Sequence, residues 1–256
     1  MARIFITGSS AGLGLLAGQH LAERGHQVVL HARTEAKAME IRRAVPNLAG
    51  VTVGDLEHIG DMRAIASAAN AYGQFDAVIH NAGVGDSGGK LTNDGLPVVF
   101  AVNALAPYVL TSMMARPKRL IYLSSNMHFG AVPAKLSKFW QDGRWHGAIN
   151  YSNTKFLDTT LAFAVARLWP ETLSNAVDPG WVPTRMGGVS APDDLTEGYL
   201  SQTWLAEASD EKTHVTGQYI RRKSIVSADP HAREGAVQEA FLALCASITG
   251  LTFPRG

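Results

Sequence analysis

Two side chains in the middle of the chain have the types and the spacing needed for proton transfer. Tyr151 and Lys155 are four residues apart in a segment with helical apolar spacing, so both leave the same face of a helix. A phenol with the ordinary pKa of about 10 is protonated at neutral pH, and a nearby ammonium lowers that pKa. Such a tyrosine can protonate a carbonyl oxygen or deprotonate an alcohol. The alternative is an ordinary amphipathic helix, because this spacing is common by chance.

A pair of serines ends an apolar run upstream of this helix. Residues 120–123 predict a buried strand, and Ser124 and Ser125 follow it directly. At the end of a strand on the same side of the sheet, Ser125 could donate a second hydrogen bond to the substrate oxygen. Ser124 remains the alternative.

A glycine-rich segment near the start of the chain is suited to binding phosphate. Thr7–Gly14 joins a strand predicted at 3–6 to a helix. The N-terminus of a helix carries unpaired N–H groups and the positive end of the dipole, and glycines let the backbone approach a pyrophosphate. Glycines at 8, 12 and 14 depart from the common G-x-G-x-x-G pattern. The alternative is a plain tight turn.

The end of the second predicted strand bears on the choice of dinucleotide. Residues 27–31 form this strand, and Arg33 follows where an NAD site places an acid on the ribose 2′-hydroxyl. A guanidinium can bind a 2′-phosphate in a fork, with Lys37 assisting, and the missing acid removes a repulsion. The alternative is a surface arginine that opens the helix predicted at 34–44. We favour NADP over NAD.

The remaining segments predict a single α/β domain over residues 1–256. Strands and helices alternate, with strands at 51–53, 77–80, 120–123, 172–177 and 217–220 and helices at 58–69, 94–114, 149–169, 194–208 and 231–247. This alternation predicts a single Rossmann-fold domain: a doubly wound parallel sheet of about seven strands with helices on both faces. Pro107 should kink its helix. We expect a substrate-side insert at 126–149, with a short helix near 134–141, and a substrate or lid region at 183–215.

Composition limits the partners and the compartment. The formal net charge of the 256 residues is +1, which gives no indication of a nucleic-acid surface. The single cysteine, Cys245, excludes an internal disulfide, and the nine histidines are scattered without metal-ligand spacing. No apolar run is long enough to cross a bilayer, and no signal peptide precedes the first strand. We expect a cytoplasmic protein with a small-molecule substrate and no nucleic-acid, membrane or metal partner.

Taken together, these motifs resemble the short-chain dehydrogenase/reductase family over essentially the whole chain. The resemblance is carried by Thr7–Gly14, Asp55-Leu56, Asn81-Ala82-Gly83, Asn103, Ser124-Ser125, Tyr151–Lys155 and Asp178-Pro179-Gly180. The segments 94–103 and 215–219 look like the retinol-dehydrogenase-like branch. The resemblance implies a Rossmann fold and hydride transfer between NAD(P) and an alcohol or carbonyl carbon. It also implies a homodimer or homotetramer in which the helices at 94–114 and 149–169 pair between subunits.

The resemblance further implies a role for each matching residue. Tyr151 would be the catalytic acid/base, Ser125 would hold the substrate oxygen, and Asn103 would hold a water that links Lys155 to solvent. Lys155 would also lower the pKa of the tyrosine and bind the nicotinamide ribose. The implied cofactor-binding residues are Gly8, Ser10, Gly12, Leu13, Gly14, Arg33, Asp55, Leu56, Asn81, Ala82, Gly83, Tyr151, Lys155, Pro179, Gly180, Val182 and Thr184.

Two departures from the family pattern surround the tyrosine. Ser125 and Tyr151 lie farther apart than is common, and Asn153 and Thr154 stand where small residues are usual. The insert fills the longer spacing. Six apolar side chains from the insert and the lid region suggest an apolar substrate pocket: Met127, Phe129, Trp140, Trp145, Trp181 and Met186. The alternative is that half of them belong to core or lid packing.

Three functions compete on this sequence. The leading prediction is an NADPH-dependent carbonyl reductase or alcohol dehydrogenase. A non-catalytic NADP-binding sensor or interaction protein predicts a broken Tyr/Lys/Ser set, whereas here the set is intact. An epimerase or dehydratase acting on a nucleotide sugar would resemble enzymes with a T-G-x-x-G-x-x-G loop, which differs from the spacing in this chain.

Overall fold

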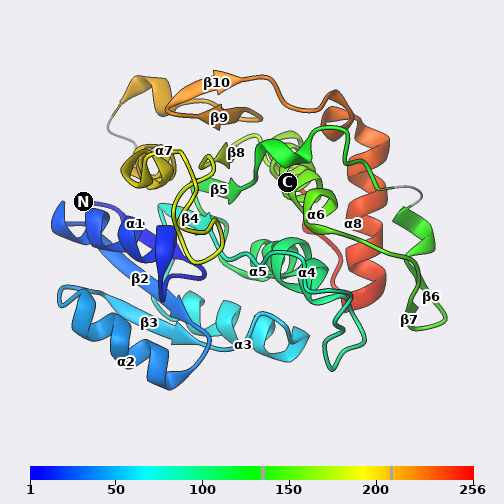
Figure 1. Cartoon of the computed structure of the whole chain (residues 1–256), viewed down its shortest axis with the longest axis horizontal. Helices are drawn as coiled ribbons and strands as arrows, with labels where there is room; N and C mark the ends of the chain where they lie inside the picture. Colours follow the sequence, from blue (N-terminus) through cyan, green and yellow to red (C-terminus); the bar gives the residue numbers. More distant parts are fainter. Residues whose placement is uncertain (134–135, 208–209) are drawn as a thin grey trace.

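An eight-stranded sheet forms the centre of the molecule. The computed structural model describes residues 1–133, 136–207 and 210–256. The strand order is β10-β9-β8-β5-β4-β1-β2-β3 (Figure 1). The strands are β1 (Arg3–Ile6), β2 (Gln27–Ala32), β3 (Gly50–Val53), β4 (Ala77–His80), β5 (Arg119–Leu123), β8 (Leu173–Asp178), β9 (Tyr219–Arg221) and β10 (Ser224–Val226). Seven of them run parallel, and β10 pairs antiparallel with β9. The predicted doubly wound Rossmann-like fold is confirmed, with one edge strand more than the seven expected.

Helices cover both faces of the sheet. The helices α1 (Gly12–Glu23), α2 (Glu35–Ala44) and α7 (Leu195–Glu207) pack on one face, and α3 (Ile59–Asn70), α5 (Ala106–Met113) and α6 (Tyr151–Leu168) pack on the other (Figure 1). Alternate residues of a strand therefore enter different cores. In β1, Phe5 joins the core beneath α3 and α5, whereas Ile4 and Ile6 join the core beneath α1 and α2. Residue 208, the expected end of the helix predicted at 194–208, lies outside the described residues.

The helix expected at 94–114 contains a π-helical turn. It begins as α4 (Val98–Phe100), continues as a π-helix (Ala101–Leu105) and ends as α5. Pro107 has no N–H to donate to the carbonyl of Asn103, so the regular ladder is interrupted at this point. The kink expected at Pro107 is thus a widened turn that contains Asn103.

The insert at 126–149 differs from the expected short helix. A 3₁₀ turn at Leu136–Lys138 leads into a hairpin of β6 (Trp140–Gln141) and β7 (Arg144–Trp145). Its turn residues, Asp142 and Gly143, have positive φ angles of 49° and 70°, as two-residue hairpin turns require. Residues 134–135, the start of the expected helix, lie outside the described residues.

The aromatic residues of the insert fold back onto the core. Trp145 stacks on Phe139 with ring centroids 5.0 Å apart and lies 4.6 Å from Phe100 of α4. Trp140 also packs against this core. The prediction that Trp140 and Trp145 line the substrate pocket is therefore corrected: the hairpin turns them toward α4 and α8 (Gly235–Thr249).

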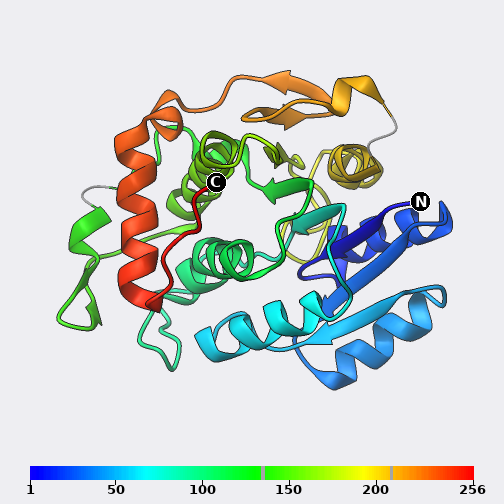
Figure 2. The same cartoon turned by 180° about the vertical axis from the view of Figure 1, so that it is seen from behind.

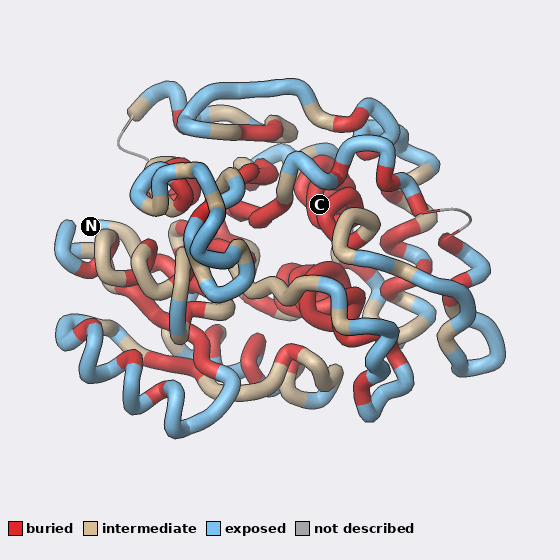
Figure 3. The backbone as a smooth tube through the Cα atoms, viewed as in Figure 1, coloured by how far each residue is buried: buried red, intermediate tan, exposed pale blue. Residues whose placement is uncertain are grey.

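The C-terminal part of the chain covers α5 and α6. Helix α8 packs along α6, and the following segment passes beside α5 (Figure 2). Tyr108 Oη donates to the carbonyl of Leu251 at 2.5 Å, and Trp169 Nε1 donates to that of Pro254 at 2.6 Å. Most of α6 is buried in this arrangement (Figure 3). The chain's own C-terminal segment thus covers part of α5 and α6, and the expected pairing of these helices between subunits stays a prediction.

Candidate active site

The predicted site residues gather at the carboxyl edge of the sheet, where β1, β4, β5 and β8 end (Figure 1). Asn81, directly after β4, donates from Nδ2 to the carbonyls of Thr7 and Gly8 at 3.0 and 3.1 Å. The loop after β8 reaches the same place, because a Cβ on Gly12 would lie 3.7 Å from the Thr184 methyl group. Three segments far apart in the sequence therefore meet beside the start of α1.

The loop between β1 and α1 packs so closely against Asn81 and Ala82 that side chains could not replace its glycines. Gly8 has a φ of +62°, and a Cβ there would lie 2.6 Å from Cα of Ala82. A Cβ on Gly14 would overlap the Asn81 amide. Ala11, the residue before α1, makes no side-chain capping bond, so N–H groups of the first turn remain available to an anion. Ser10 lies on this loop and Leu13 in that first turn. The cradle thus fits a pyrophosphate.

A histidine absent from the sequence prediction supports this loop. His31 accepts a hydrogen bond from the Gly8 N–H at Nδ1, 3.0 Å away, and its Nε2 lies 2.9 Å from the Gly54 carbonyl oxygen. Since Nδ1 accepts, Nε2 carries the proton and the ring is neutral. Burial accordingly lowers the pKa of His31.

The residues expected at the adenosine end lie just beyond His31. Arg33 is exposed, and its Nε lies 3.9 Å from Oδ2 of Asp55. Asp55 also accepts the Glu57 N–H at 3.0 Å, which fixes the bend after β3. The Leu56 side chain is buried in the core, so only its backbone is a candidate contact for a cofactor.

Helix α6 begins at the candidate acid/base because two asparagines cap it. Asn150 Oδ1 accepts the Asn153 N–H at 2.9 Å, and Asn153 Oδ1 accepts the Asn150 N–H at 3.1 Å, forming a capping box. The Tyr151 N–H donates to Oδ1 of Asp86 in the loop after β4. Asn153, one of the departures from the family pattern, thus fixes the position of half-buried Tyr151.

Lys155 lies one turn further along α6 and is buried. Its Nζ donates to the Leu123 carbonyl at 2.7 Å and to Oδ2 of Asp158 at 2.8 Å, and lies 5.6 Å from the centre of the Tyr151 ring. Burial opposes the ammonium, but Asp158 and Tyr151 together outweigh it and raise the pKa of Lys155. Burial raises the pKa of Asp158 in turn.

The side chain of Asn103 joins the π-turn to the loop after β4 and to α6. Its Oδ1 accepts the Val84 N–H at 2.8 Å, while Nδ2 donates to the Val84 carbonyl at 2.9 Å and to Thr154 Oγ1 at 3.0 Å. A Cβ on Gly83 would lie 3.6 Å from both Asn103 Oδ1 and Lys155 Nζ. Both N–H donors of the amide are occupied, so the expected water would bind at an acceptor, which is either the backbone carbonyl of Asn103 or the second lone pair of Oδ1.

The two serines after β5 have different surroundings. Ser124 is buried, and its Oγ donates to the Lys155 carbonyl at 2.9 Å and lies 2.8 Å from Thr159 Oγ1. Ser125 is half-buried, and its Oγ accepts the Met127 N–H at 3.2 Å. Ser124 therefore anchors α6 to β5, whereas the Ser125 hydroxyl makes only local contacts: it accepts the Met127 N–H and donates to Asn126 Oδ1 at 3.4 Å.

The loop after β8 closes over the start of α1. A Cβ on Gly198 in α7 would lie within 3.4 Å of atoms of Val182, Leu13 and Pro179, so these residues meet there. Gly180 has a φ of +80° and donates its N–H to Oδ1 of Asp178 at 2.8 Å. Four apolar side chains stay about half exposed around this edge: Met127 at 53%, Phe129 at 50%, Trp181 at 56% and Met186 at 53%.

The comparisons with known proteins identify the family. The model of the short chain dehydrogenase family matches residues 2–194. The chain belongs to this family. An oxidoreductase of Emericella nidulans is 40% identical to the dehydrogenase over 262 residues, which cover 100% of both chains. Retinol dehydrogenase 13 of Homo sapiens is 26% identical over 283 residues, covering 98% of this chain and 85% of that protein.

A solved structure confirms the fold of the dehydrogenase. The crystal structure of a protein from Mycobacterium Paratuberculosis matches with a TM-score of 0.81 at 23% identity, covering 99% of this chain and 95% of that one. Family and fold together make the chain a short-chain oxidoreductase with retinol-dehydrogenase-like relatives, and they support a nicotinamide cofactor. No described helix is both long and apolar enough to span a membrane.

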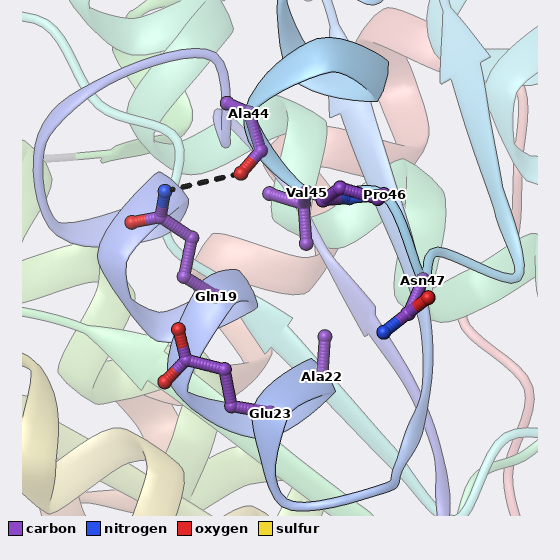
Figure 4. Close-up of a pocket in the computed structure, with 7 residues that line it drawn as sticks. All are labelled: Gln19, Ala22, Glu23, Ala44, Val45, Pro46 and Asn47. Atoms are coloured by element: carbon purple, nitrogen blue, oxygen red, sulfur yellow. Dashed lines mark hydrogen bonds between the residues drawn. The ribbon is translucent and has the colours of Figure 1, made fainter.

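Two hollows at the surface of the dehydrogenase lie away from the candidate site residues. One of about 70 Å³ sits between α1 and the end of α2, where Gln19 Nε2 donates to the Ala44 carbonyl at 3.4 Å (Figure 4). It contains none of the candidate site residues and is too small for a dinucleotide. Among the described residues, no group of three or more His, Cys, Asp or Glu side chains is arranged to hold a metal ion.

Two further residues of the dehydrogenase escaped the sequence prediction. Asp158 contacts Lys155, and its signal was available: an acid three residues after a lysine, inside the apolar run of α6. His128 is fully buried and links the Ser125 carbonyl, 2.8 Å from its Nδ1, to the Asp229 N–H, 3.0 Å from its Nε2. Its partner lies 101 residues away, so no local pattern indicates its role.

Proposed function

We propose that the chain is an NADP(H)-dependent carbonyl reductase or alcohol dehydrogenase in which Tyr151 is the acid/base. The observation that carries the proposal is that four predicted parts lie at one edge of the sheet: the glycine loop, Gly83, Ser125 just after β5, and the Tyr151–Lys155 pair. The glycine loop is suited to phosphate, and Ser125 and Tyr151 carry the hydroxyl groups that can donate to a substrate carbonyl oxygen. A sensor without catalysis would not need this set.

The proposed chemistry divides between the cofactor and the chain. When bound, the nicotinamide supplies the hydride that adds to the carbonyl carbon. Tyr151 donates its hydroxyl proton to the carbonyl oxygen, which completes the alcohol, and Ser125 donates a hydrogen bond to the same oxygen. The Lys155 ammonium stabilises the phenolate left on Tyr151. Proton return to Tyr151 runs past Lys155 to a water at Asn103.

Arg33 supports the choice of NADP. It is an exposed guanidinium just beyond β2, at the place where an NAD site has an acid. Its partner Asp55 is 3.9 Å away, too far for a hydrogen bond, so the guanidinium keeps its donors for a phosphate. The remaining members of the proposed cofactor site are the residues of the glycine loop, of 81–83 and of 179–184.

The half-exposed apolar side chains around the edge support a small, apolar carbonyl substrate. Met127 and Phe129 follow Ser125, and Trp181 and Met186 belong to the loop after β8. Exposed large apolar groups near a catalytic edge favour apolar ligands, because covering them releases water. The retinoid named for the human relative does not follow for this chain, since loops such as these vary with substrate among proteins of one fold.

The experiment follows NADPH absorbance with a panel of ketones and aldehydes, for wild type and Tyr151→Phe. We expect turnover of apolar carbonyl compounds by the wild type and a loss of at least about 10²-fold in the variant. Tryptophan fluorescence quenching should give the same NADPH affinity for both proteins. Turnover that persists in the variant would exclude Tyr151 as the acid, and NADPH binding without turnover of any carbonyl would favour the sensor.

A further inference from the structure

We propose that Asp158 is a positioning residue for proton transfer: its carboxylate keeps the buried ammonium of Lys155 charged and fixed beside Tyr151. The inference rests on the proposed function, since it extends the pair assigned there to a third residue. Asp158 lies outside every motif that carries the family resemblance. The contact that points to it is the ion pair inside α6.

The geometry leaves little freedom to the lysine. Asp158 lies three residues after Lys155 on α6, and the two side chains are each 4% exposed. The carboxylate at 2.8 Å and the Leu123 carbonyl at 2.7 Å take two of the three N–H donors of the ammonium. The third donor remains for the side where Gly83 and Tyr151 lie. On that side, Lys155 Nζ is 5.6 Å from the centre of the Tyr151 ring, and a Cβ added to Gly83 would lie 3.6 Å from it.

The electrostatics require a counter-charge at this position. A lysine removed from water loses its proton readily unless an opposite charge is close. The pKa of Lys155 is nevertheless raised, because the charge and hydrogen bond of Asp158, together with Tyr151, more than offset the effect of burial. A neutral amine would not stabilise a phenolate. Asp158 therefore acts on Tyr151 through the charge of Lys155.

The neighbouring strands supply no substitute for Asp158. Tyr122 of β5 faces the pair, and burial together with Asp158 raises its pKa, so it stays a neutral phenol. His80 of β4 stacks on Tyr122 at 4.8 Å, and burial lowers its pKa to about 3, so it is uncharged. Thr111 bridges these two groups at 3.0 and 2.9 Å. Within the described part of the chain, Lys155 has no ion-pair partner besides Asp158.

The test substitutes Asp158→Asn, which keeps the size and an oxygen acceptor for Lys155 while removing the charge. The readout is the ultraviolet titration of tyrosine in the cofactor-free protein. Subtracting the curve of the same protein with Tyr151→Phe isolates Tyr151 from the other tyrosines. We expect the titration midpoint of Tyr151 to rise by about one pH unit or more in D158N, because Lys155 loses charge. The acidic limb of alcohol oxidation should move to higher pH with it.

The matched control is Thr160→Val. Thr160 is also buried in α6, but its hydroxyl donates only to the Phe156 carbonyl, at 2.9 Å, and not to Lys155. T160V should leave the Tyr151 midpoint unchanged even if it lowers the melting temperature. A midpoint that is unchanged or lower in D158N, or one that shifts equally in T160V, overturns the proposal.

A second background keeps the test decisive if D158N does not fold. In Lys155→Met, adding D158N removes both buried charges, and it should not raise the Tyr151 midpoint further. A further rise would show that Asp158 acts without Lys155 and would overturn the proposal. These titrations need neither cofactor nor substrate. Failure of the proposed reductase activity would therefore leave their result unaffected, and the two failures can be told apart.

Discussion

At the scale of single residues, the chemistry depends on groups whose neighbours were only partly visible in the sequence. Tyr151 and Lys155 could be predicted because a four-residue spacing fixes one helix face. Asp158 follows the same rule, yet an acid inside an apolar run is more simply interpreted as solvent-facing. The different surroundings of Ser124 and Ser125 depend on whether each side chain turns toward α6, which the spacing alone does not specify.

Arg33 carries the prediction on cofactor choice. Arg33→Ala should weaken NADPH binding about 10- to 100-fold, since a charge-assisted bond to phosphate contributes about 1.5–3 kcal/mol. NADH, which lacks the 2′-phosphate, should bind the variant as it binds the wild type. Fluorescence titration of both nucleotides measures this. The matched control is Arg42→Ala, an exposed arginine in the last turn of α2. Equal loss for NADPH and NADH would contradict the role given to Arg33.

At the scale of elements, the seven parallel strands were predictable because most of them are short runs of apolar residues buried on both faces. The eighth, β10, was not predicted. Its turn with β9 places Arg222 and Lys223 at positive φ angles of 48° and 59°, without the glycine or asparagine that signals such a turn. The hairpin in the insert does carry an Asp-Gly signal, at 142–143, but the mixed pattern around it favoured a short helix.

The π-turn between α4 and α5 gives a prediction about an element. Pro107→Ala restores an N–H that can bond the Asn103 carbonyl, so the turn should tighten toward a regular α-helix. We expect a loss of about 10-fold or more in kcat, because a small displacement of catalytic groups has large effects. The melting temperature should stay near that of the wild type.

Pro97→Ala is the control for this prediction, since Pro97 lies at the start of α4 and outside the π-turn. Steady-state kinetics and thermal melting of both variants decide the matter. If P107A turns over at the wild-type rate, the π-turn has no part in positioning Asn103.

At the scale of the whole molecule, buried neutral histidines couple stability to pH. The pKa of His80 is about 3 in the fold, against an ordinary value of about 6.5, and burial also lowers the pKa of His31 and His128. Between these values the unfolded chain binds protons that the folded chain does not. The contribution of these three histidines to stability is therefore constant above about pH 6.5 and falls as pH decreases below it.

For His80 alone the loss is about 1.4 kcal/mol per pH unit below about 6.5. The urea concentration at the unfolding midpoint should thus be lower at about pH 5 than at about pH 7.5. Most carboxyl groups are charged at both of these pH values, so they contribute little to the difference. His80→Gln places a non-titrating amide near the Thr111 hydroxyl and should reduce this loss. An identical loss in the variant and the wild type would contradict the assignment to His80.

The arrangement of α8 also belongs to this scale. Its apolar periodicity could be predicted, whereas its packing against α6 results from contacts between distant parts of the chain. Arg167 of α6, for example, donates from Nε to Gln238 Oε1 at 2.7 Å across 71 residues. The oligomer that the family resemblance implies stays a prediction.

The most direct measurement of the central claim follows a label from NADPH to product. The wild type and Tyr151→Phe are given NADPH carrying deuterium at the reactive C4 position, together with an apolar ketone or aldehyde, and the alcohol is analysed by mass spectrometry. The account predicts deuterium on the carbinol carbon with the wild type and almost no alcohol with the variant. Alcohol without the label, or labelled alcohol formed equally fast by both proteins, would contradict it.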